Sequence, residues 1–529
     1  MKLAAALAAA AIALAAPATA SASTSSAATL ALRGIARGLA KHWLKPQDAA
    51  RYRTDVARAQ RDAATLPKLR AYVVESQLAQ LTTLWDSYIS PRALALFSQV
   101  ETNLSYLETH PLPATSIDIT GDDGIVYRWF SGHGFEFHPL ANFSALNNVA
   151  AANDAGTTGQ LAAALLARAI PRDSRLIWEY AFAFGSGRPP WASGMAQAVA
   201  AQALARASAL LEDPSLGAAA VRAYASVPPF LLSLPSGPWI RLYGFNNEVV
   251  LNAQLQTILS LLEYAQRSGD ASASTLAQRL DATAQALLPR FDTGDWSRYE
   301  LGGGYAPREY ERYVTDLLAK LGRQTQEPFW TATAQRFHDY LYTPPQVTQP
   351  APPPTIWPQP ADGYLDAAPI QVTLSMRASI SVAIAGQVTT YRVGPGPHLL
   401  TWRPPSGLTP GTYPVRISAV SFAGNRAAYS LAPVVVAWDT TPPPIAAALQ
   451  GTTLTWQAND PGTPWLALAV DVADPNGVNP PQTLDLGRLP TSGQAQLALP
   501  PGTWTATLRA TNSAGLTTTY ALGTVAVSG

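Results

Sequence analysis

The stretch PPQVTQPAPPPTIWPQP, residues 344–360, divides this 529-residue chain into two parts of different composition. Before it, runs rich in Ala and Leu carry apolar residues at helical spacing, whereas short β-branched runs separated by Gly and Pro follow it. Its proline density favours an extended, semi-rigid linker. Because the chain is also too long for one ordinary core, we expect a multidomain protein that is helical first and β-rich afterwards.

The part after the linker contains an internal repeat. The triplet GTY at residues 411–413 returns 91 residues later as GTW at residues 502–504, and other Gly, Tyr and Val pairs share this offset. A period of this length fits a small β-sandwich, and the aromatic residue that ends each triplet is expected in a core. The sequence predicts two β-sandwiches, over residues 361–438 and 442–529.

The part before the linker predicts three successive elements. Residues 28–114 form a helical segment rich in Ala and Leu, and residues 116–130 alternate around the turn GDDG (121–124), which is typical of a β-hairpin. At least seven helical stretches follow, and the short connections between them favour antiparallel neighbours. The predicted fold class is therefore multidomain α plus all-β: an incomplete α/α toroid domain with a short β element, residues 115–343, followed by two β-sandwiches.

The N-terminus has the features of a signal peptide. Lys2 precedes an apolar stretch at residues 3–16, and small residues at 18–22 offer cleavage sites. The apolar stretch is shorter than the about 20 residues that a membrane span needs. We expect residues 1–22 to be removed and the mature protein to be secreted or held at the cell surface without a transmembrane span.

Composition excludes several classes of protein. Thirty-six basic residues nearly cancel 35 acidic ones, so the chain lacks the basic excess of a nucleic-acid binder. It has no cysteine, which excludes disulfides and thiol catalysis, and its six histidines show no metal-ligand spacing. We predict no nucleic-acid partner, no metal site and no cofactor. The oligomeric state stays open.

Three stretches interrupt the apolar helices with aromatic, polar, Gly and Pro residues. They are PPWASGMAQ at 189–197, PWIRLYGFNNEVVLN at 238–252 and FDTGDWSRYEL at 291–301. The third is followed by APREY at 306–310, where the next helix is expected to begin. Because a toroid builds its cleft at the ends of its helices, we expect these stretches to form a binding site.

The same stretches resemble the D-glucuronyl C5-epimerase family, through its helical C-terminal domain. The resemblance covers residues 125–343 and rests on elements that keep the family's order and spacing. These elements are W-x-S-x-M-A-Q at 191–197, W-x-x-x-Y at 239–243 with VLN at 250–252, LPRFDTG at 288–294 with YEL at 299–301, and, as a weaker match, GFEFHPL at 134–140.

The resemblance implies a substrate with a uronic-acid unit in a glycan, whose C5 proton is removed on one face and returned on the other. It implies Tyr243, Tyr299 and Tyr310 as catalytic residues, and Glu248 is a further catalytic candidate. That proton is weakly acidic, so the carboxylate must meet a cation or hydrogen-bond donors, and a tyrosine base needs a cation that lowers its pKa. Substrate-binding candidates are Trp191, Arg241, Asn252, Arg298, Arg308 and His138.

The sequence departs from the family pattern beside these candidates. Arg241 and Leu242 stand where the family has acidic residues, Gly302 follows YEL where the family has arginine, and Glu311 and Val314 replace histidines. Three functions therefore stay open. They are a uronate C5-epimerase-like isomerase, a polysaccharide lyase that expels the C4 substituent after the same proton abstraction, and a non-catalytic cell-surface glycan-binding protein.

Overall fold

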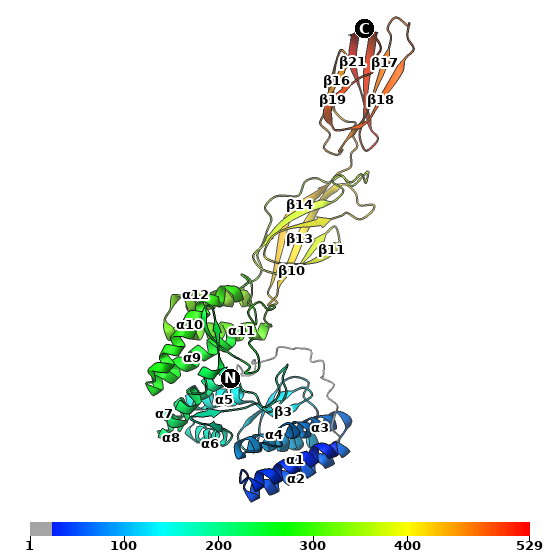
Figure 1. The fold of residues 1–529 in the computed structure, drawn as a ribbon. Coiled ribbons are helices and arrows are strands. Elements are labelled where there is room, and N and C mark those ends of the chain that lie inside the picture. The colour runs from blue at the N-terminus through cyan, green and yellow to red at the C-terminus, as the bar shows by residue number, and fades with distance from the viewer. Residues whose placement is uncertain (1–23, 529) are drawn as a thin grey trace. The chain divides into compact units, whose positions relative to one another are not determined.

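A computed structural model describes residues 24–528, and the predicted signal peptide lies outside these described residues. The chain divides into two compact units, Met1–Leu341 and Tyr342–Gly529. The first is mainly helical and the second is built of strands, which confirms the predicted fold class (Figure 1). No helix in the described part of the chain is both long and apolar enough to cross a membrane.

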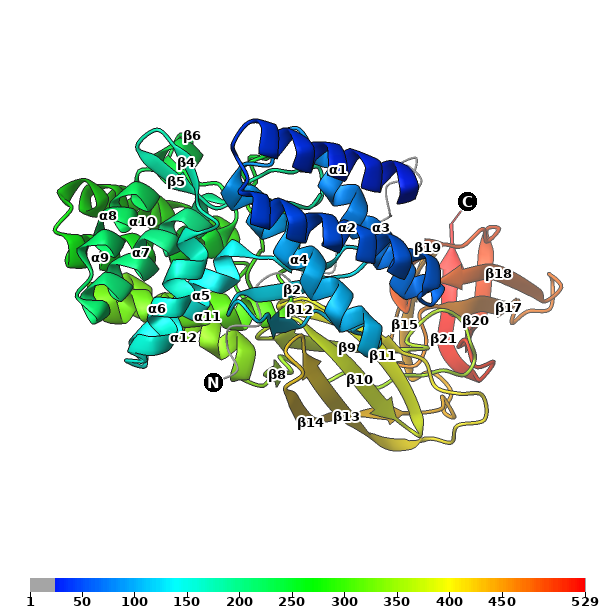
Figure 2. The ribbon, with the colours of Figure 1, turned by 90° about the horizontal axis from the view of Figure 1, so that it is seen from below.

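The first unit opens with helices that pack side by side (Figure 2). These are α1 (Thr24–Ala40), α2 (Pro46–Thr65), α3 (Lys68–Thr83) and α4 (Ser90–Thr109). Tyr52 of α2 stacks on Phe97 of α4 with ring centroids 4.2 Å apart. A Cβ atom on Gly34 of α1 would lie 2.6 Å from the ring of Tyr88, so glycine permits the close approach of α1.

A small antiparallel sheet follows, with strands β1 (Asp118–Thr120), β2 (Val126–Phe130) and β3 (Gly134–Phe137) in that order. The hairpin predicted around GDDG is confirmed as β1 and β2. Strand β3 was not predicted as a strand, because all its residues are buried and its sequence does not alternate. Glu136 of β3 accepts hydrogen bonds from Gln77 and Gln80 of α3, at 2.8 and 2.5 Å, which fixes the sheet on the first helices.

Between residues 139 and 342 the described chain forms eight helices, at the positions where the sequence predicts helical stretches. They are α5 (Pro139–Ala151), α6 (Ala155–Leu166), α7 (Gly194–Leu211), α8 (Pro214–Tyr224), α9 (Leu251–Ser268), α10 (Ala271–Phe291), α11 (Arg308–Thr325) and α12 (Pro328–Tyr342). Helices α5, α7, α9 and α11 neighbour one another in turn, and α5, α7 and α9 each pack on the helix that follows. This is an incomplete α/α toroid with α7 and α9 innermost.

Short hairpins occupy two of the connections in this toroid. Strands β4 (Ile170–Arg172) and β5 (Arg175–Ile177) precede α7, and β6 (Leu231–Leu234) and β7 (Gly237–Ile240) precede α9. A 3-10 turn at Pro228–Phe230 leads into β6. The connection with β4 and β5 also contains the start of the first stretch singled out from the sequence. The connection with β6 and β7 contains most of the second stretch, residues 238–252.

The second unit consists of two β-sandwiches with equivalent strand orders. In the first, sheet β11-β10-β13-β14 faces β12-β9-β8; in the second, β18-β17-β20-β21 faces β15-β16-β19. The strands are β8 (Val347–Thr348), β9 (Ala368–Leu374), β10 (Ala378–Ile384), β11 (Gln387–Val393), β12 (Gly396–Trp402), β13 (Gly411–Ser421), β14 (Arg426–Val436), β15 (Ile445–Gln450), β16 (Thr453–Ala458), β17 (Leu466–Ala473), β18 (Gln482–Leu489), β19 (Ser492–Gln496), β20 (Gly502–Thr511) and β21 (Thr517–Val527).

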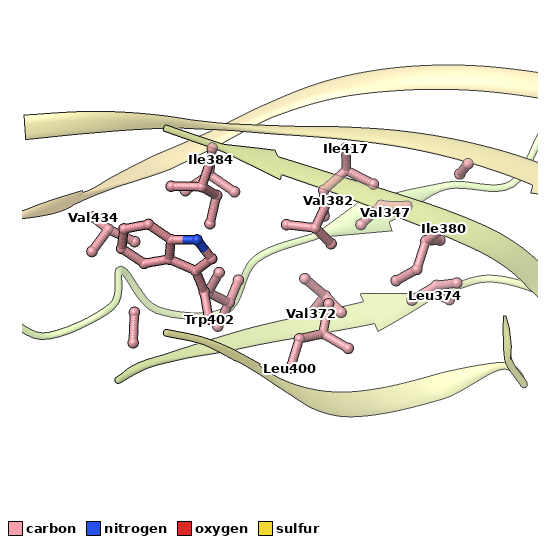
Figure 3. Packing of buried hydrophobic residues seen from close by; sticks show 14 of the residues in the cluster. Val347, Val372, Leu374, Ile380, Val382, Ile384, Leu400, Trp402, Ile417 and Val434 are labelled. Atoms are coloured by element: carbon pink, nitrogen blue, oxygen red, sulfur yellow. The ribbon is translucent and has the colours of Figure 1, made fainter. Parts of the chain in front are cut away.

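The core of each sandwich is made by the inward side chains of alternating strands. Figure 3 shows Val382 and Ile417 of one sheet facing Val372 and Leu400 of the other. The repeated triplets begin β13 and β20, at equivalent places in the two domains. Trp504 is fully buried in the core of the second sandwich. Tyr413 is half-buried against the core of the first sandwich, so both aromatic residues pack as predicted.

The proline-rich segment does more than link the two parts. Val347 on β8 pairs with Leu374 of β9, and Ile356 is fully buried in the core of the first sandwich. The Ile356 backbone N–H also donates to the carbonyl of Val435 at 2.9 Å. Residues predicted as a linker thus supply an edge strand, where prolines are tolerated, and part of a core.

We predict that Trp504→Ala destabilises the second sandwich by about 3–5 kcal/mol, because it leaves a cavity where a fully buried indole was. Calorimetric unfolding of the full chain should show one transition moved to lower temperature. Val478→Ala is the control, since Val478 is 81% exposed on the same domain. Equal transition temperatures for the two variants would show that Trp504 does not hold this core.

Candidate functional site

An aromatic cavity lies at the N-terminal ends of α5, α7, α9 and α11, and the empty space in it, open solvent at its mouth included, amounts to about 790 Å³. Its aromatic wall residues are Phe130, Tyr180, Phe182, Phe184, Trp191, Tyr243, Tyr299, Tyr310 and Tyr313. Four polar or charged residues share the wall: His138, Ser193, Asn252 and Glu309. The cavity thus combines apolar ring faces with a few groups that can form hydrogen bonds.

Local capping chemistry brings the helix ends to this cavity. His138 and Ser193 are the N-cap residues of α5 and α7. The His138 Nδ1 atom accepts from the backbone N–H of Ala141 at 3.1 Å, and the Ser193 hydroxyl accepts from that of Ala196 at 3.2 Å. Each side chain therefore begins a helix and lines the cavity at the same time.

The segment before α7 forms one aromatic side of the cavity. Tyr180 and Trp191 exchange backbone hydrogen bonds, and their rings stack with centroids 4.0 Å apart and an interplanar angle of 2°. The indole N–H of Trp191 donates to the carbonyl of Phe182 at 2.8 Å. Trp191 is consequently a fixed, buried part of the wall, whereas the half-buried rings of Phe130 and Phe184 stay accessible.

The structure brings the three predicted tyrosines together and separates their roles. The hydroxyl groups of Tyr243 and Tyr299 lie 3.4 Å apart on the cavity wall. Burial raises the pKa of both phenols above its usual value, so both carry their protons at neutral pH. The Tyr310 hydroxyl accepts from the backbone N–H of Asn252 and donates to the carbonyl of Tyr299, which makes it a tie between α9 and the loop before α11.

The predicted charged candidates lie outside the cavity wall. Arg298 donates to the carbonyl of Gly303, and the Arg241 Nε atom donates to the side chain of Asn247 at 3.1 Å. Arg308 is exposed at the first residue of α11. Glu248 is exposed as well, and desolvation and the charge of Glu300 raise its pKa.

The other two predicted binding residues, His138 and Asn252, do line the cavity. His138 is buried, and burial with the nearby charge of Arg128 lowers its pKa well below the usual value, so the imidazole is neutral. Asn252 is 3% exposed, and its Oδ1 atom is buried without a hydrogen-bond partner among the described residues. Because this atom has almost no accessible surface, it is covered by protein atoms and does not face the open part of the cavity.

Several wall residues were not predicted from the sequence. Tyr180, Phe182 and Phe184 alternate in an extended segment, and this period of two is a signal that could have marked them as one surface. Tyr313 follows Tyr310 by three residues on α11 and so shares its helix face. Phe130 comes from the end of β2, and no local pattern connects it with the toroid.

A buried carboxyl group, that of Glu311, stabilises the site without lining the cavity. Its Oε2 atom accepts from both the backbone N–H and the hydroxyl of Ser297, which ties the loop that carries Tyr299 to α11. Burial raises the pKa of Glu311 to about 8, and the charges of Asp292 and Asp295 act in the same direction. At neutral pH this carboxyl therefore stays largely protonated.

Residues 172–339 match the family described as the D-glucuronyl C5-epimerase C-terminus, which confirms the resemblance. Over these residues the chain is similar to a glycan-directed family. No curated protein matches the chain significantly.

Solved structures with similar parts include glucanases and fibronectin-like modules. An endoglucanase from Komagataeibacter sucrofermentans is 15% identical, covering 38% of this chain and 72% of its own, with a TM-score of 0.30. A GH8 endo-beta-1,4-glucanase from an Achatina fulica gut metagenomic library is 18% identical over 42% and 76%, with a TM-score of 0.33. The fibronectin(III)-like modules of Clostridium thermocellum CbhA are 13% identical over 35% and 94%, with a TM-score of 0.17.

We predict that Glu311→Gln makes stability less dependent on pH. The folded pKa near 8 lies above the ordinary value of 4.5, so the protonated carboxyl's contribution is present in full below pH 4.5 and is lost as pH rises toward 8. The loss is at most about 1.4 kcal/mol per pH unit. Urea unfolding at pH 5, 6.5 and 8 should show a smaller decline for Glu311→Gln than for the wild type.

The control for this measurement is Glu309→Gln, because Glu309 is an exposed carboxylate two residues away on the same helix. It should keep the wild-type decline. The assignment of Glu311 as a buried, protonated group fails if its glutamine variant declines as steeply as the wild type.

Proposed function

We propose that the cavity binds a sugar unit of a glycan. The accessible rings of Phe130 and Phe184 beside the phenols of Tyr243 and Tyr299 carry this proposal. A sugar ring has an apolar C–H face that packs on an aromatic ring and a rim of hydroxyl groups that needs hydrogen-bond partners. Such a wall, mostly apolar with a few converging polar groups, is the general form of a small-molecule site.

The family match supports the same function. The matched segment, residues 172–339, contains most of the wall, from Tyr180 to Tyr313. We further propose that the protein meets its glycan outside the cytoplasm, as the signal-peptide features of residues 1–22 indicate.

We predict that Phe184→Ala weakens glycan binding about tenfold, equivalent to about 1.4 kcal/mol, because the variant loses an accessible stacking face. Isothermal titration of the full chain with a panel of soluble oligosaccharides, both uncharged and uronic, measures this. Phe422→Ala is the control, since Phe422 is exposed on the first sandwich and is not one of the residues that line the cavity. Glycan binding in the cavity is ruled out if the wild type binds no member of the panel, or if Phe184→Ala binds as the wild type does.

A second candidate function is the C5 epimerisation of a uronate. The 3.4 Å contact between the Tyr243 and Tyr299 hydroxyls favours it, because the family match covers both residues. With both phenols protonated, one can return a proton to C5, but the proton must first be taken by another base. Glu248 is the candidate for that base, since its charge contributes to the raised pKa of both tyrosines.

For this second candidate we predict that the wild type incorporates deuterium at C5 of a uronate polymer in heavy water. Tyr243→Phe or Tyr299→Phe should then lower the exchange rate by about 10²- to 10⁴-fold, because each removes a transferable proton with little change in volume. Tyr72→Phe, at an exposed tyrosine of α3, is the matched control. An unsaturated, ultraviolet-absorbing product would identify a lyase instead, and absence of any exchange would exclude proton chemistry at C5.

A further inference from the structure

We propose that the sugar unit bound in this cavity is uncharged, a neutral hexose whose hydroxyl groups pair with the wall, rather than a uronate. The inference rests on the proposed glycan binding and names the chemical class of the ligand. It departs from what the family resemblance implies, and three properties of the wall carry it.

The first property is the charge of the wall. Of residues 24–528, which the structure describes, none that lines the cavity is a lysine or an arginine, and Glu309 is its acidic member. Two of the three arginines expected to meet a carboxylate are held elsewhere, Arg298 at the carbonyl of Gly303 and Arg241 at Asn247, and the third, Arg308, is exposed and does not line the cavity. A carboxylate that left water for this wall would lose its hydration without gaining a counter-charge.

The second property is that first-turn N–H groups are already occupied at three of the four helix ends facing the cavity, whereas α11 begins after Pro307 without a side-chain cap. A helix N-terminus favours an anion through its dipole and its free N–H groups. Here the Ser193 hydroxyl, the neutral His138 ring and the Tyr310 hydroxyl accept from first-turn N–H groups of α7, α5 and α9, at 3.2, 3.1 and 3.0 Å. Uncharged side chains thus occupy donors that a carboxylate would need.

The third property is the pair of phenols, since the Tyr243 and Tyr299 hydroxyls lie 3.4 Å apart on the wall. Each of these hydroxyls can both donate and accept, as a sugar hydroxyl does, whereas an ionised carboxylate only accepts. The polar part of the wall therefore complements hydroxyl groups.

The test uses the full chain and matched oligosaccharides that differ only in C6 oxidation. The probes are gluco-, manno- and galacto-oligomers and their uronate counterparts, measured by isothermal titration at about 0.1 M salt. We expect at least one neutral oligomer to bind at least tenfold tighter than its uronate partner. Equal or tighter binding of the uronates would overturn this inference and leave the proposed glycan binding standing. If no probe bound, the proposed function itself would fail.

Two variants locate the preference in the wall. Tyr299→Phe should weaken binding of the neutral oligomer at least tenfold, because it removes one hydroxyl of the pair that complements a sugar hydroxyl. Glu309→Lys, at an exposed position of the wall, should strengthen uronate binding about tenfold. If uronate binding did not respond to this reversal of charge, or if Tyr299→Phe bound the neutral oligomer as the wild type does, the assignment of the wall as selective would be wrong.

Discussion

The close packing of α7 against α5 and α9 is the constraint on which the first unit depends. Helix α7 is buried on most of its surface because Ala dominates it, and small side chains let neighbouring helices approach. Polar groups lock the contact between α7 and α9: the Gln202 amide donates to Glu263 at 2.6 Å and accepts from the Ser260 hydroxyl at 2.9 Å. This packing fixes the helix axes, and with them the N-terminal residues that form the cavity.

The cavity then follows from how the polar groups at these helix ends are used. Most of these polar groups already form hydrogen bonds within the protein, as helix caps or between segments. The Tyr310 hydroxyl is an example, since it binds the backbone of both Asn252 and Tyr299. The groups that remain for a ligand are few, and apart from Glu309 they are uncharged, with the pair of Tyr243 and Tyr299 and the amide of Asn252 foremost. A site of this kind owes its selectivity to hydrogen-bond complementarity and ring contact rather than to electrostatic attraction.

Sequence patterns predicted those parts of the fold in which local spacing determines structure. Ala and Leu periodicity located the toroid helices, and the repeat at 411–413 and 502–504 located equivalent strands. Strand β3 was not predicted because burial on both faces removes the alternation of apolar and polar residues. The burial of Ile356 was not predicted because the surrounding prolines indicated a linker. Within the site, the tyrosines could be predicted, but the position of Arg298 could not, since a hydrogen bond to the carbonyl of Gly303 decides it.

The departures from the family pattern have a structural meaning. Glu311 stands where the family pattern has a histidine, and it is buried. It accepts a hydrogen bond from Ser297, so this substitution helps to hold the loop that carries Tyr299. Part of the wall lies outside the matched segment, because Phe130 and His138 belong to β2 and to the N-cap of α5. Similarity over residues 172–339 therefore covers the scaffold and the tyrosine pair, while the preceding elements complete the wall of the cavity.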